Sequence, residues 1–453
     1  MANAQGKIIA PKILKGFRDL LPESMIPKKK IIRTLEQVFE SFGFSPIDTP
    51  ALEYTEILLG KGSGETDKQI YRFEDHGGRD VALRFDLTVP LARFVSQHFS
   101  ELVFPFKRYH IAPVWRGENT QKGRYREFYQ CDFDILGSDN INADFEILQV
   151  IRSGFEAIGC ESYIININHR KLLNAILAKF GEESRSQKIL QTIDKIYKVG
   201  RDEVVRILVE DEGMSPESVN GILTTLRLNE NFSKEGIKGD EIFTVLEKLR
   251  DELDDKTAAE ELLTVFHNLK ECGVIEHFAY NPAITRGLDY YTGIVFESFI
   301  TDRMEFGSVC SGGRYDNLTG LYSKNVVPGV GASFGLDRLL SVLEDKQMFT
   351  KKNSVADVMI FNLDDSLIAK YYLLAEKMQK AGINCEVVSS KSKLGNQFKL
   401  AERRQIRYAL IAGTDEFENG KFNLKDVFAG EEKKAITLEE IISEIQANKK
   451  VNG

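Results

Sequence analysis

The stretch FKRYHIAPVWRGENTQKGRYREFYQCDFDILG (106–137) is the most informative part of the chain. Two extended runs of aromatic and aliphatic residues flank a polar loop that contains glycine, and this pattern predicts an antiparallel hairpin with a long loop. Because side chains alternate between the two faces of a strand, the second run has two different faces. The mostly apolar face carries Glu127, Tyr129, Cys131, Phe133 and Ile135.

The opposite face of the same run is polar and aromatic, and it carries Arg124, Arg126, Phe128, Gln130, Asp132 and Asp134. Arginine is suited to phosphates, a phenyl ring to a purine, and glutamine and aspartate to a polar small molecule. We interpret this face as a ligand platform, with Arg116 at the end of the first run beside the loop. A solvated sheet face remains the alternative, because charged and aromatic residues also occur on such faces.

The segment GVGASFGLDRLLSVL (329–343) predicts a strand that runs directly into a helix. One side of this strand would carry only Gly329, Gly331, Ser333 and Gly335, so that face is nearly bare. A bare face lets a flat ring lie against the backbone, and Arg338 in the first helical turn is suited to a phosphate or to stacking on that ring. The alternative is close packing of strand and helix, with Arg338 on the surface.

Two further segments contain polar residues whose role the spacing alone does not decide: LRFDLTVPLARF (83–94) and TRGLDYYTGIVFESF (285–299). In the first, we expect Asp86 and Thr88 on one face of a strand, where they would suit an ammonium group. In the second, Arg286 precedes Asp289 and two tyrosines. A turn that enters a strand with an exposed ion pair explains this second pattern equally well.

The chain of 453 residues is long enough for two or three domains. The part between 172 and 278 is charged, rich in leucine, glutamate and lysine and almost free of proline, which predicts a helical module inserted into a mixed domain. The last hundred residues predict a separate α/β unit, with strand candidates at 355–361, 385–388 and 408–413. Thr437 and Glu440 form a capping-box pattern ahead of a final helix.

Composition excludes several classes of protein. Apolar residues make up 42% of the chain and no run of them is long enough to span a membrane, so we expect no membrane partner. The N-terminus lacks the pattern of a signal or transit peptide, and five cysteines without a CxxC pair fit a reducing cytoplasm and predict neither a disulfide framework nor a zinc site. The net charge of −8 excludes a histone-like basic coat but not a nucleic-acid partner, since local patches govern that binding.

Together these segments resemble the histidyl-tRNA synthetase family of class II aminoacyl-tRNA synthetases, from about Gly16 to Gly430. The stretch from Gly43 to Pro50 resembles class II motif 1, which forms the dimer interface in that family. VWRGENTQKGRYREF resembles motif 2, and GVGASFGLDR resembles motif 3. RGLDYYTG and SGGRYD (311–316) resemble stretches particular to the histidine enzymes.

The resemblance implies an α+β fold with two parts. Residues 1–345 would form a class II catalytic domain on an antiparallel sheet, with the helical insertion at 172–278, and residues 355–453 an α/β anticodon-binding domain. It also implies a cytoplasmic homodimer that activates L-histidine with ATP and then transfers it to the 3′-terminal adenosine of histidine tRNA. The alternatives are a ligase for another amino acid, against which RGLDYYTG argues, and a non-catalytic histidine-sensing relative, against which the retained arginines argue.

For ATP, the resemblance assigns Arg116, Glu118, Arg124, Phe128 and Arg338. Arg116 would hold the α-phosphate opposite Arg286, and these two would form the catalytic pair, because fixed cations stabilise the charge that develops there. Phe128 and Arg338 would enclose the adenine ring, whose amino group would donate to Glu118, while Arg124 would contact the phosphate tail. Mg²⁺ would bridge the β- and γ-phosphates, held mostly by phosphates and water, so no protein metal cluster is expected.

For histidine, the resemblance assigns Asp86, Thr88, Gln130, Asp134, Tyr291 and Tyr315. The first three would take the α-ammonium group. Asp134 and Tyr291 would bind the imidazole, with Tyr315 as a neighbour. Partners for both ring nitrogens allow discrimination of about 10⁴–10⁵ against amino acids that leave them unpaired. Several family members carry glutamate where Asp86 and Asp134 stand, which changes the reach of the carboxylate and not its charge.

The segment KSKLGNQFKLAERRQIR (391–407) is strongly basic and resembles part of the family's anticodon-binding domain. The residues expected to contact the tRNA backbone there are Lys393, Lys399, Arg403 and Arg404. A solvated basic helix would show the same composition, so the order of the domains and not the charge alone favours RNA.

Overall fold

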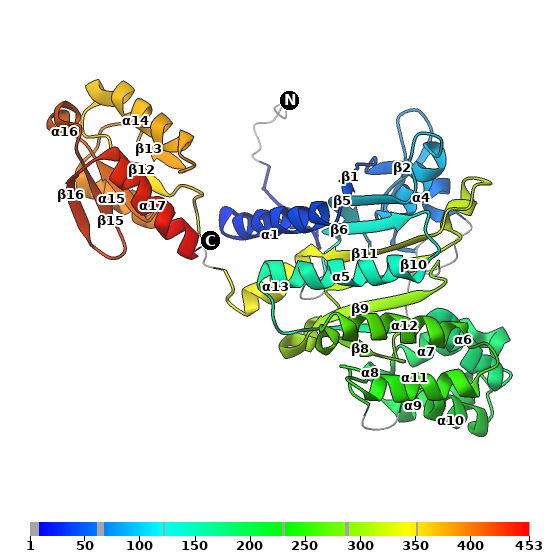
Figure 1. Cartoon of the computed structure of the whole chain (residues 1–453). Coiled ribbons are helices and arrows are strands. Elements are labelled where there is room, and N and C mark those ends of the chain that lie inside the picture. Colours follow the sequence, from blue (N-terminus) through cyan, green and yellow to red (C-terminus); the bar gives the residue numbers. More distant parts are fainter. Residues whose placement is uncertain are drawn as a thin grey trace. The chain divides into compact units, whose positions relative to one another are not determined.

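The computed structural model describes residues 9–60, 68–120, 123–228, 232–285, 290–349 and 352–452. The chain divides into two compact units, which are considered separately below (Figure 1). The N-terminal unit contains residues 1–18 and 30–348, and the C-terminal unit contains residues 19–29 and 349–453. No described helix has both the length and the apolar composition that a bilayer crossing requires.

A mixed, mainly antiparallel sheet forms the centre of the N-terminal unit, in agreement with the predicted fold class. Only the two edge strands, β1 and β8, pair with their neighbours in parallel. In spatial order the strands are β1 (Ser45–Pro46), β5 (Phe106–Trp115), β6 (Glu127–Leu136), β11 (Gly329–Gly335), β10 (Cys310–Tyr315), β9 (Ile294–Ile300), β7 (Tyr163–His169) and β8 (Phe278–Tyr280).

The predicted hairpin is confirmed: β5 and β6 pair in antiparallel register from Phe106 opposite Leu136 to Trp115 opposite Glu127. The apolar face of β6 packs under α1 (Pro22–Ser41) and α5 (Ile141–Ile158). The rings of Phe39 and Phe133 stack with centroids 4.7 Å apart. Burial of such aromatic surface, which has no polar atoms to satisfy, is what holds the helices on this face.

Helix α5 begins and ends as its sequence dictates. The side chain of Asn140 accepts a hydrogen bond from the amide of Asn142 and caps the N-terminus, while Gly159 adopts the left-handed conformation at the C-terminus. Inside the helix, Gly154 allows close contact with the sheet, because a Cβ there would lie 2.7 Å from the ring of Phe334. The helix therefore sits directly on β11.

The connection between β1 and β5 forms a small sheet of its own. Its strands, in the order β2-β4-β3, are β2 (Leu52–Tyr54), β4 (Asp80–Leu83) and β3 (Arg72–Glu74), and they are accompanied by α2 (Thr55–Leu59) and α4 (Thr88–Gln97). The expected strand through Asp86 and Thr88 was wrong. Strand β4 ends at Leu83, Asp86 lies in the following loop, and Thr88 is the first residue of α4.

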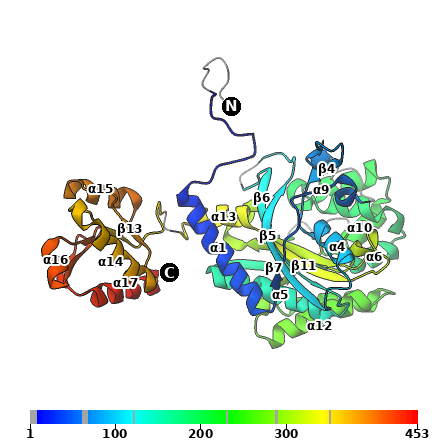
Figure 2. The ribbon, with the colours of Figure 1, turned by 90° about the horizontal axis from the view of Figure 1, so that it is seen from above.

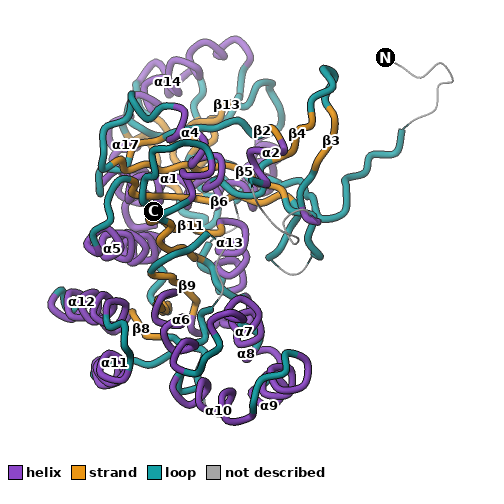
Figure 3. Tube along the Cα trace, turned by 90° about the vertical axis from the view of Figure 1, so that its right-hand side faces the viewer, coloured by secondary structure: helices purple, strands orange, loops and turns teal. Residues whose placement is uncertain are grey.

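Between β7 and β8 the described chain is helical, and these helices gather beside the β8 edge of the sheet (Figures 1 and 3). The α-helices are α6 (Arg170–Lys179), α7 (Ser186–Ile193), α8 (Ile196–Val199), α9 (Arg201–Arg206), α10 (Pro216–Thr225), α11 (Glu241–Glu252) and α12 (Thr257–Glu271). Three short irregular helices join them: η1 (Glu183–Arg185), η2 (Ile207–Asp211) and η3 (Ile275–His277).

The segment after β9 returns through two short 3₁₀ helices, η4 (Thr301–Phe306) and η5 (Leu318–Leu321), which flank β10. The predicted passage from strand to helix at 329–343 is confirmed, because β11 leads directly into α13 (Leu336–Asp345). Figure 2 shows α5 and α1 beside the strands from above.

The C-terminal unit is an α/β sandwich with a five-stranded sheet. Its strands, in the order β13-β12-β14-β15-β16, are β13 (Cys385–Val387), β12 (Val358–Ile360), β14 (Tyr408–Ile411), β15 (Phe422–Asp426) and β16 (Glu432–Ile436). The first three are parallel and were predicted; the antiparallel pair β15 and β16 was not. The helices are η6 (Asp365–Leu367), α14 (Ile368–Lys380), α15 (Leu394–Arg404), α16 (Thr414–Asn419) and α17 (Leu438–Asn452).

Helices cover both faces of this second sheet, as its buried clusters show. Tyr371 of α14 and Ile441 of α17 pack on one face, and Ala401 of α15 packs on the other. The predicted capping box of α17 is confirmed: the Thr437 amide donates to Glu440 Oε2 at 2.8 Å, and the Glu440 amide donates to Thr437 Oγ1 at 3.3 Å.

We predict that Gly312→Ala lowers the free energy of unfolding of the N-terminal unit by about 3 kcal/mol or more. A Cβ at this position in β10 would lie 2.1 Å from the carbonyl oxygen of Gly331, and backbone cannot move aside cheaply. Gly335→Ala is the matched control in the same sheet, because the nearest atom to its added Cβ, the carbonyl oxygen of Val309, is 3.7 Å away. Thermal unfolding should show a large decrease in the free energy of unfolding for Gly312→Ala and a decrease of less than about 1 kcal/mol for Gly335→Ala. Similar decreases for the two variants would contradict the prediction.

Candidate active site

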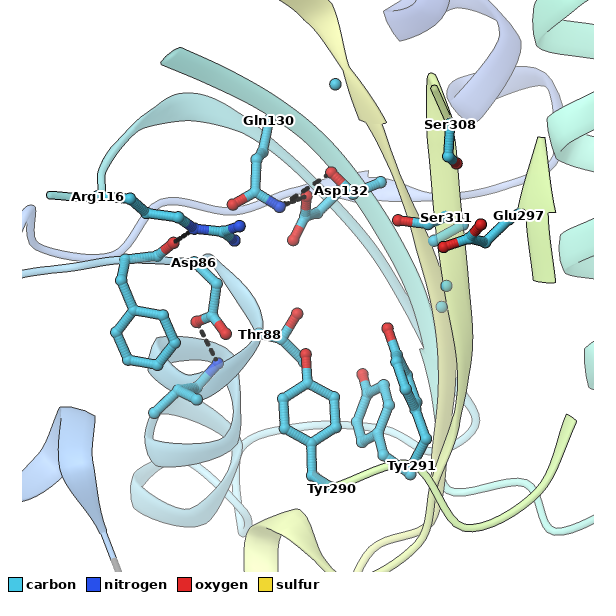
Figure 4. Close-up of a pocket in the computed structure, with 18 of the residues that line it drawn as sticks. Asp86, Thr88, Arg116, Gln130, Asp132, Tyr290, Tyr291, Glu297, Ser308 and Ser311 are labelled. Atoms are coloured by element: carbon cyan, nitrogen blue, oxygen red, sulfur yellow. Dashed lines mark hydrogen bonds between the residues drawn. The ribbon is translucent and has the colours of Figure 1, made fainter. Parts of the chain in front are cut away.

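A cavity of about 1070 Å³ opens on the polar face of the main sheet. Its floor comes from β6, β9, β10 and β11, and its walls from the loop before α4, the loop between β5 and β6, the start of α13 and the helices after β7. Figure 4 shows Arg116, Asp86, Gln130 and Asp132 pointing into one space, with Tyr290 and Tyr291 on another side of it. This cavity is large enough for a nucleotide and an amino acid together.

The register between β6 and β11 gives the polar residues of the floor their room. Asp134 lies opposite Gly331, Asp132 opposite Ser333 and Gln130 opposite Gly335. A Cβ on Gly331 would lie 2.0 Å from Asp134 Oδ1. The nearly bare face predicted for residues 329–335 is therefore confirmed, and it serves the side chains of the neighbouring strand as well as any ring that lies on it.

Asp86 is a buried carboxyl with an acceptor that is free within the described structure. Its Oδ1 accepts a hydrogen bond from the Val89 amide at 3.0 Å, in the first turn of α4. Its Oδ2 is buried and has no hydrogen-bond partner among the described residues. Burial raises the pKa of Asp86 to about 6, although the positive charge of Arg116 opposes the shift. A cation with N–H groups would therefore find here an oxygen that can accept a hydrogen bond.

Gln130 and Asp132 form a second polar group beside Asp86. The Gln130 amide nitrogen donates to Asp132 Oδ1 at 3.3 Å and to Ser333 Oγ at 3.1 Å. Its Oε1 is buried and has no partner within the described chain. Burial raises the pKa of Asp132 to about 7, with Arg108 opposing the shift. Sequence reasoning placed Asp132 on this face without giving it a role.

Asp134, by contrast, already has strong partners. Its Oδ2 lies 2.6 Å from Nη2 of Arg108, a residue of β5 whose side chain is completely buried. Its Oδ1 accepts a hydrogen bond from the Tyr315 hydroxyl at 2.5 Å. Burial raises the pKa of Asp134, and both partners act in the opposite direction. Arg108 was missed, although the hairpin register alone places it opposite Asp134.

Three tyrosines stand together beside these carboxyls. The Tyr290 ring centroid lies 4.9 Å from that of Tyr291 and 5.8 Å from that of Tyr315, both in edge-on geometry. Thr292, which follows Tyr290 and Tyr291, ties their segment to the strand that carries Tyr315. Its hydroxyl donates to Asp316 Oδ2 at 2.6 Å, and its amide donates to the carbonyl of Arg314 at 2.8 Å. The three hydroxyls give the cavity donors and acceptors on an otherwise aromatic wall.

An ion pair under the sheet holds this arrangement in place. The Arg314 guanidinium donates to both carboxylate oxygens of Asp144, a residue of the first turn of α5, and to the carbonyl of Ser138 at 2.9 Å. Because both partners are buried, loss of either one would leave a charge without compensation. In the stretch SGGRYD, Arg314 therefore stabilises the fold through its ion pair, and Tyr315 lines the cavity.

Cationic side chains also line the cavity. Arg116 Nε donates to the carbonyl of Phe85 at 2.8 Å, and its guanidinium lies 5.2 Å from the Phe128 ring centroid. Glu118 lies between two arginines, 3.9 Å from Arg116 Nη1 and 3.8 Å from Arg124 Nη1. An anion with several negative charges would be attracted to these side chains.

Arg338 completes this cationic group. Its Nη1 donates to the carbonyl of Ser308, which fixes the side chain across the cavity. Burial lowers the pKa of Arg338 to about 10, with a contribution from the nearby positive charges of Arg124 and Arg116, so the group stays charged at neutral pH. Three guanidinium groups from two distant segments therefore share one cavity.

The part of the cavity near Arg338 contains residues that sequence reasoning missed. Glu297 of β9 faces inward together with Ser308 and Ser311 (Figure 4). The helices after β7 add Arg170 and Lys195 to the rim. Their contribution depends on the order of strands in the sheet and on tertiary packing, which no local pattern in the sequence encodes.

The other predicted residues fall elsewhere. Arg286 lies outside the described residues. On α15 of the C-terminal unit, Lys399 and Arg403 are exposed, and Lys393 is exposed at its start, whereas Arg404 is paired with Glu386. Within the described ranges there is no group of three or more His, Cys, Asp or Glu side chains arranged to hold a metal ion.

The chain is similar to known proteins in its domains, in its whole sequence and in its fold. Residues 16–339 match the family model for histidyl-tRNA synthetase, and residues 357–448 match that for the anticodon binding domain. A histidine–tRNA ligase from Treponema denticola is 45% identical over 98% of this chain and 99% of its own length, and one from Wolinella succinogenes is 44% identical over 95% and 97%. The crystal structure of histidyl-tRNA synthetase from Nostoc sp. PCC 7120 is 32% identical and superimposes with a TM-score of 0.87 over 97% of this chain and 100% of that chain.

The raised pKa of Asp132 predicts a stability effect that depends on pH. Because the folded state holds this proton up to about pH 7 and the unfolded chain loses it near pH 3.8, wild-type stability falls as the pH rises between these values. We expect Asp132→Asn to raise the free energy of unfolding by about 2 to 4 kcal/mol at pH 8, and by much less at pH 4. Urea unfolding at both pH values measures the difference; an equal effect at the two would contradict the prediction.

Proposed function

The chain belongs to the histidyl-tRNA synthetase family, and on that premise we propose that its cavity holds ATP and L-histidine side by side for the first step of histidine–tRNA ligation. The enzyme activates histidine with ATP, releasing pyrophosphate, and transfers the histidyl group to tRNA. One observation supports the assignment of the cavity most strongly. Arg116, Arg124 and Arg338 line one part of it, the arginine end, and Asp86 and Gln130 leave buried acceptor oxygens in the adjoining part, the carboxyl end, beside Arg116.

The arginine end is the binding site for the nucleotide. Arg116 contacts the α-phosphate, and Arg124 contacts the phosphate tail. The Phe128 ring lies against one face of the adenine and Arg338 against the other, since a guanidinium stacks well on an aromatic plane. Glu118, which lies between Arg116 and Arg124, accepts a hydrogen bond from the adenine amino group.

The carboxyl end is the binding site for histidine. Asp86, Thr88 and Gln130 take the α-ammonium group, which has three N–H donors. Asp134 and Tyr291 bind the imidazole, and Tyr315 supports this contact through its hydrogen bond to Asp134. Although Asp134 Oδ2 is in an ion pair with Arg108, this buried oxygen accepts no hydrogen bond within the described structure, so a substrate without a ring nitrogen at this point would leave it unpaired.

The reaction requires positioning and charge stabilisation and not a protein base. The nucleophile is the histidine carboxylate, which is already ionised, and it attacks the α-phosphorus in line with the departing pyrophosphate. The main barrier is repulsion between two anions, so guanidinium groups fixed on either side of the α-phosphate stabilise the transition state. We assign Arg116 to one side and Arg286 to the other.

Mg²⁺ fits this cavity as an ion held mainly by ATP. The described cavity offers oxygen ligands without a cluster of carboxylates: Glu297, Ser308 and Ser311 lie in it together. Mg²⁺ prefers oxygen ligands and keeps several waters, so one carboxylate with the β- and γ-phosphates is a suitable set. Of the protein residues, we assign Glu297 to this ion, which supplies charge neutralisation when bound.

The C-terminal unit is a second site of tRNA binding. Its match to the anticodon binding domain and the exposed cations Lys393, Lys399 and Arg403 support contacts with the RNA backbone. Arg404 contributes to this surface although it is paired with Glu386 in the free protein. We further propose that the enzyme works as a cytoplasmic homodimer, with the dimer interface around residues 43–50.

Exchange of radioactive pyrophosphate into ATP tests the assignment of the substrate. With the twenty amino acids supplied singly, we expect exchange with histidine and background levels with the other nineteen, because only the imidazole pairs with Asp134 and Tyr291. Exchange with another amino acid would show that the enzyme activates that amino acid instead of histidine. No exchange with any of them would favour a histidine sensor on the same fold.

Substitution of the two catalytic arginines tests the mechanism. We expect Arg116→Ala and Arg286→Ala each to lower the rate of adenylate formation by about 10²–10³, with a much smaller change in the dissociation constant for ATP. Arg303→Ala is the control, because Arg303 is partly exposed, is paired with Asp345 and does not line the cavity. Single-turnover kinetics and equilibrium ATP binding separate the two quantities, and equal losses in both would contradict the roles assigned.

A further inference from the structure

We propose that Asp132 binds the α-ammonium group of histidine and orients Gln130 to do the same, so that it makes the site selective for amino acids over their deaminated analogues. This inference rests on the proposed function, since it assumes that histidine occupies the carboxyl end of the cavity. It adds a residue to the three assigned above, Asp86, Thr88 and Gln130. The case for it comes from hydrogen-bond geometry, from charge and from position.

An ammonium group presents three donors, and the cavity offers a matching number of oxygens. Asp86 Oδ2 and Gln130 Oε1 are buried and have no hydrogen-bond partner within the described structure. Leaving such acceptors unpaired is unfavourable, and a ligand that donates hydrogen bonds to both would remove this cost. Asp132, which lines the same cavity and is 2% exposed, supplies a third acceptor beside them.

Asp132 also determines which atom Gln130 presents to the cavity. The Gln130 amide nitrogen donates to Asp132 Oδ1 at 3.3 Å and to Ser333 Oγ at 3.1 Å. With its nitrogen held by these two oxygens, the amide turns its Oε1 away from them, where it can accept a hydrogen bond. If position 132 had no acceptor, Ser333 would be the remaining described residue that holds the Gln130 amide in this orientation.

Charge distinguishes Asp132 from Asp134, two residues further along β6. Asp134 is paired with Arg108 at 2.6 Å and accepts the Tyr315 hydroxyl, so its charge is compensated inside the protein. Among the described residues Asp132 forms no ion pair, although the positive charge of Arg108 opposes the rise in its pKa. A buried carboxyl of this kind gains most from a cation that arrives with the substrate.

The position of Asp132 fits the ammonium better than the ring. It lies between Gln130 and Asp134 on one face of β6, and Figure 4 shows it facing the space that Asp86 and Gln130 also face. Tyr291 and Tyr315, the aromatic partners proposed for the imidazole, lie around Asp134 instead. The ammonium end and the imidazole end are therefore separated along the strand.

Several charged and titratable groups surround Asp132 and share its response to pH. They are Asp86, Arg84, Arg108, His110, Asp134, Tyr291 and Cys310. Of these, Asp86 is the other carboxyl whose pKa, about 6, lies near neutrality. An ammonium placed between the two carboxyls lowers both pKa values, so histidine binding near pH 7 releases protons to the solvent.

Two ligands and one substitution test the proposal. The ligands are L-histidine and 3-(imidazol-4-yl)propionate, which has the same ring and carboxylate but no ammonium group. We expect Asp132→Asn to weaken histidine binding about 10- to 100-fold, the loss of a hydrogen bond to a charged group, and to change binding of the propionate less than about 3-fold. Titration calorimetry at pH 7 in buffers of different ionisation enthalpy should also show fewer protons released by the variant on binding histidine.

Asp134→Asn is the matched comparison, since it changes the same chemical group two residues away on the same strand face. Asp134→Asn should weaken the binding of both ligands by similar factors, because both have the imidazole ring. If Asp132→Asn instead weakens both ligands equally, or neither, or leaves the proton release unchanged, the proposal is wrong. Failure of the proposed function would look different: the wild-type protein would then lack histidine-dependent pyrophosphate exchange.

Discussion

The antiparallel register between β6 and β11 is the constraint on which the whole site depends. It places Gly331, Ser333 and Gly335 beside Asp134, Asp132 and Gln130, so each long polar side chain has a small or absent neighbour. A shift of one residue would turn the polar face of β6 toward α1 and α5, where Phe133 and Cys131 now pack. Burial of the apolar face of β6 thus fixes the register. The register in turn places small residues beside the polar side chains of the site, which leaves space for them.

The same face of the sheet concentrates charge that the protein only partly neutralises. Arg108 compensates Asp134, but Asp86 and Asp132 are buried without a comparable cation, and Arg338 lies close to two other arginines. Such an arrangement costs folding free energy, because each group would be more stable in water. In the proposed function, histidine brings a cation to the acids and ATP brings a polyanion to the arginines, so binding of the substrates would offset this cost.

Much of the fold could be predicted because its signals are local. Strict alternation identified both faces of β6, and the spacing of small residues identified β11 and the helix after it. Asp86 and Thr88 were misplaced because the alternation in residues 83–94 outweighed Pro90, which fits the first turn of a helix. Strand β16 was missed because EKKAI is charged and mostly exposed at an edge, where packing imposes no pattern.

The candidate site could be predicted in part for the same reason. Residues of β6 and β11 were found from their own segments, whereas Glu297, Lys195 and Arg170 enter the cavity only through strand order and tertiary packing. Arg108 is an intermediate case, since the hairpin register placed it opposite Asp134 but nothing in the sequence indicated that the pair would be fully buried.

A crystal structure with L-histidine and a non-hydrolysable ATP analogue would test the central claim most directly. If the β6–β11 register builds one site for both substrates, the α-amino nitrogen of histidine will lie within hydrogen-bond distance of Asp86 and Gln130. The phosphates of the ATP analogue will lie between Arg116 and Arg338. A structure in which either ligand lies outside this cavity, or in which the two bind more than a few ångströms from a reactive approach, would contradict it.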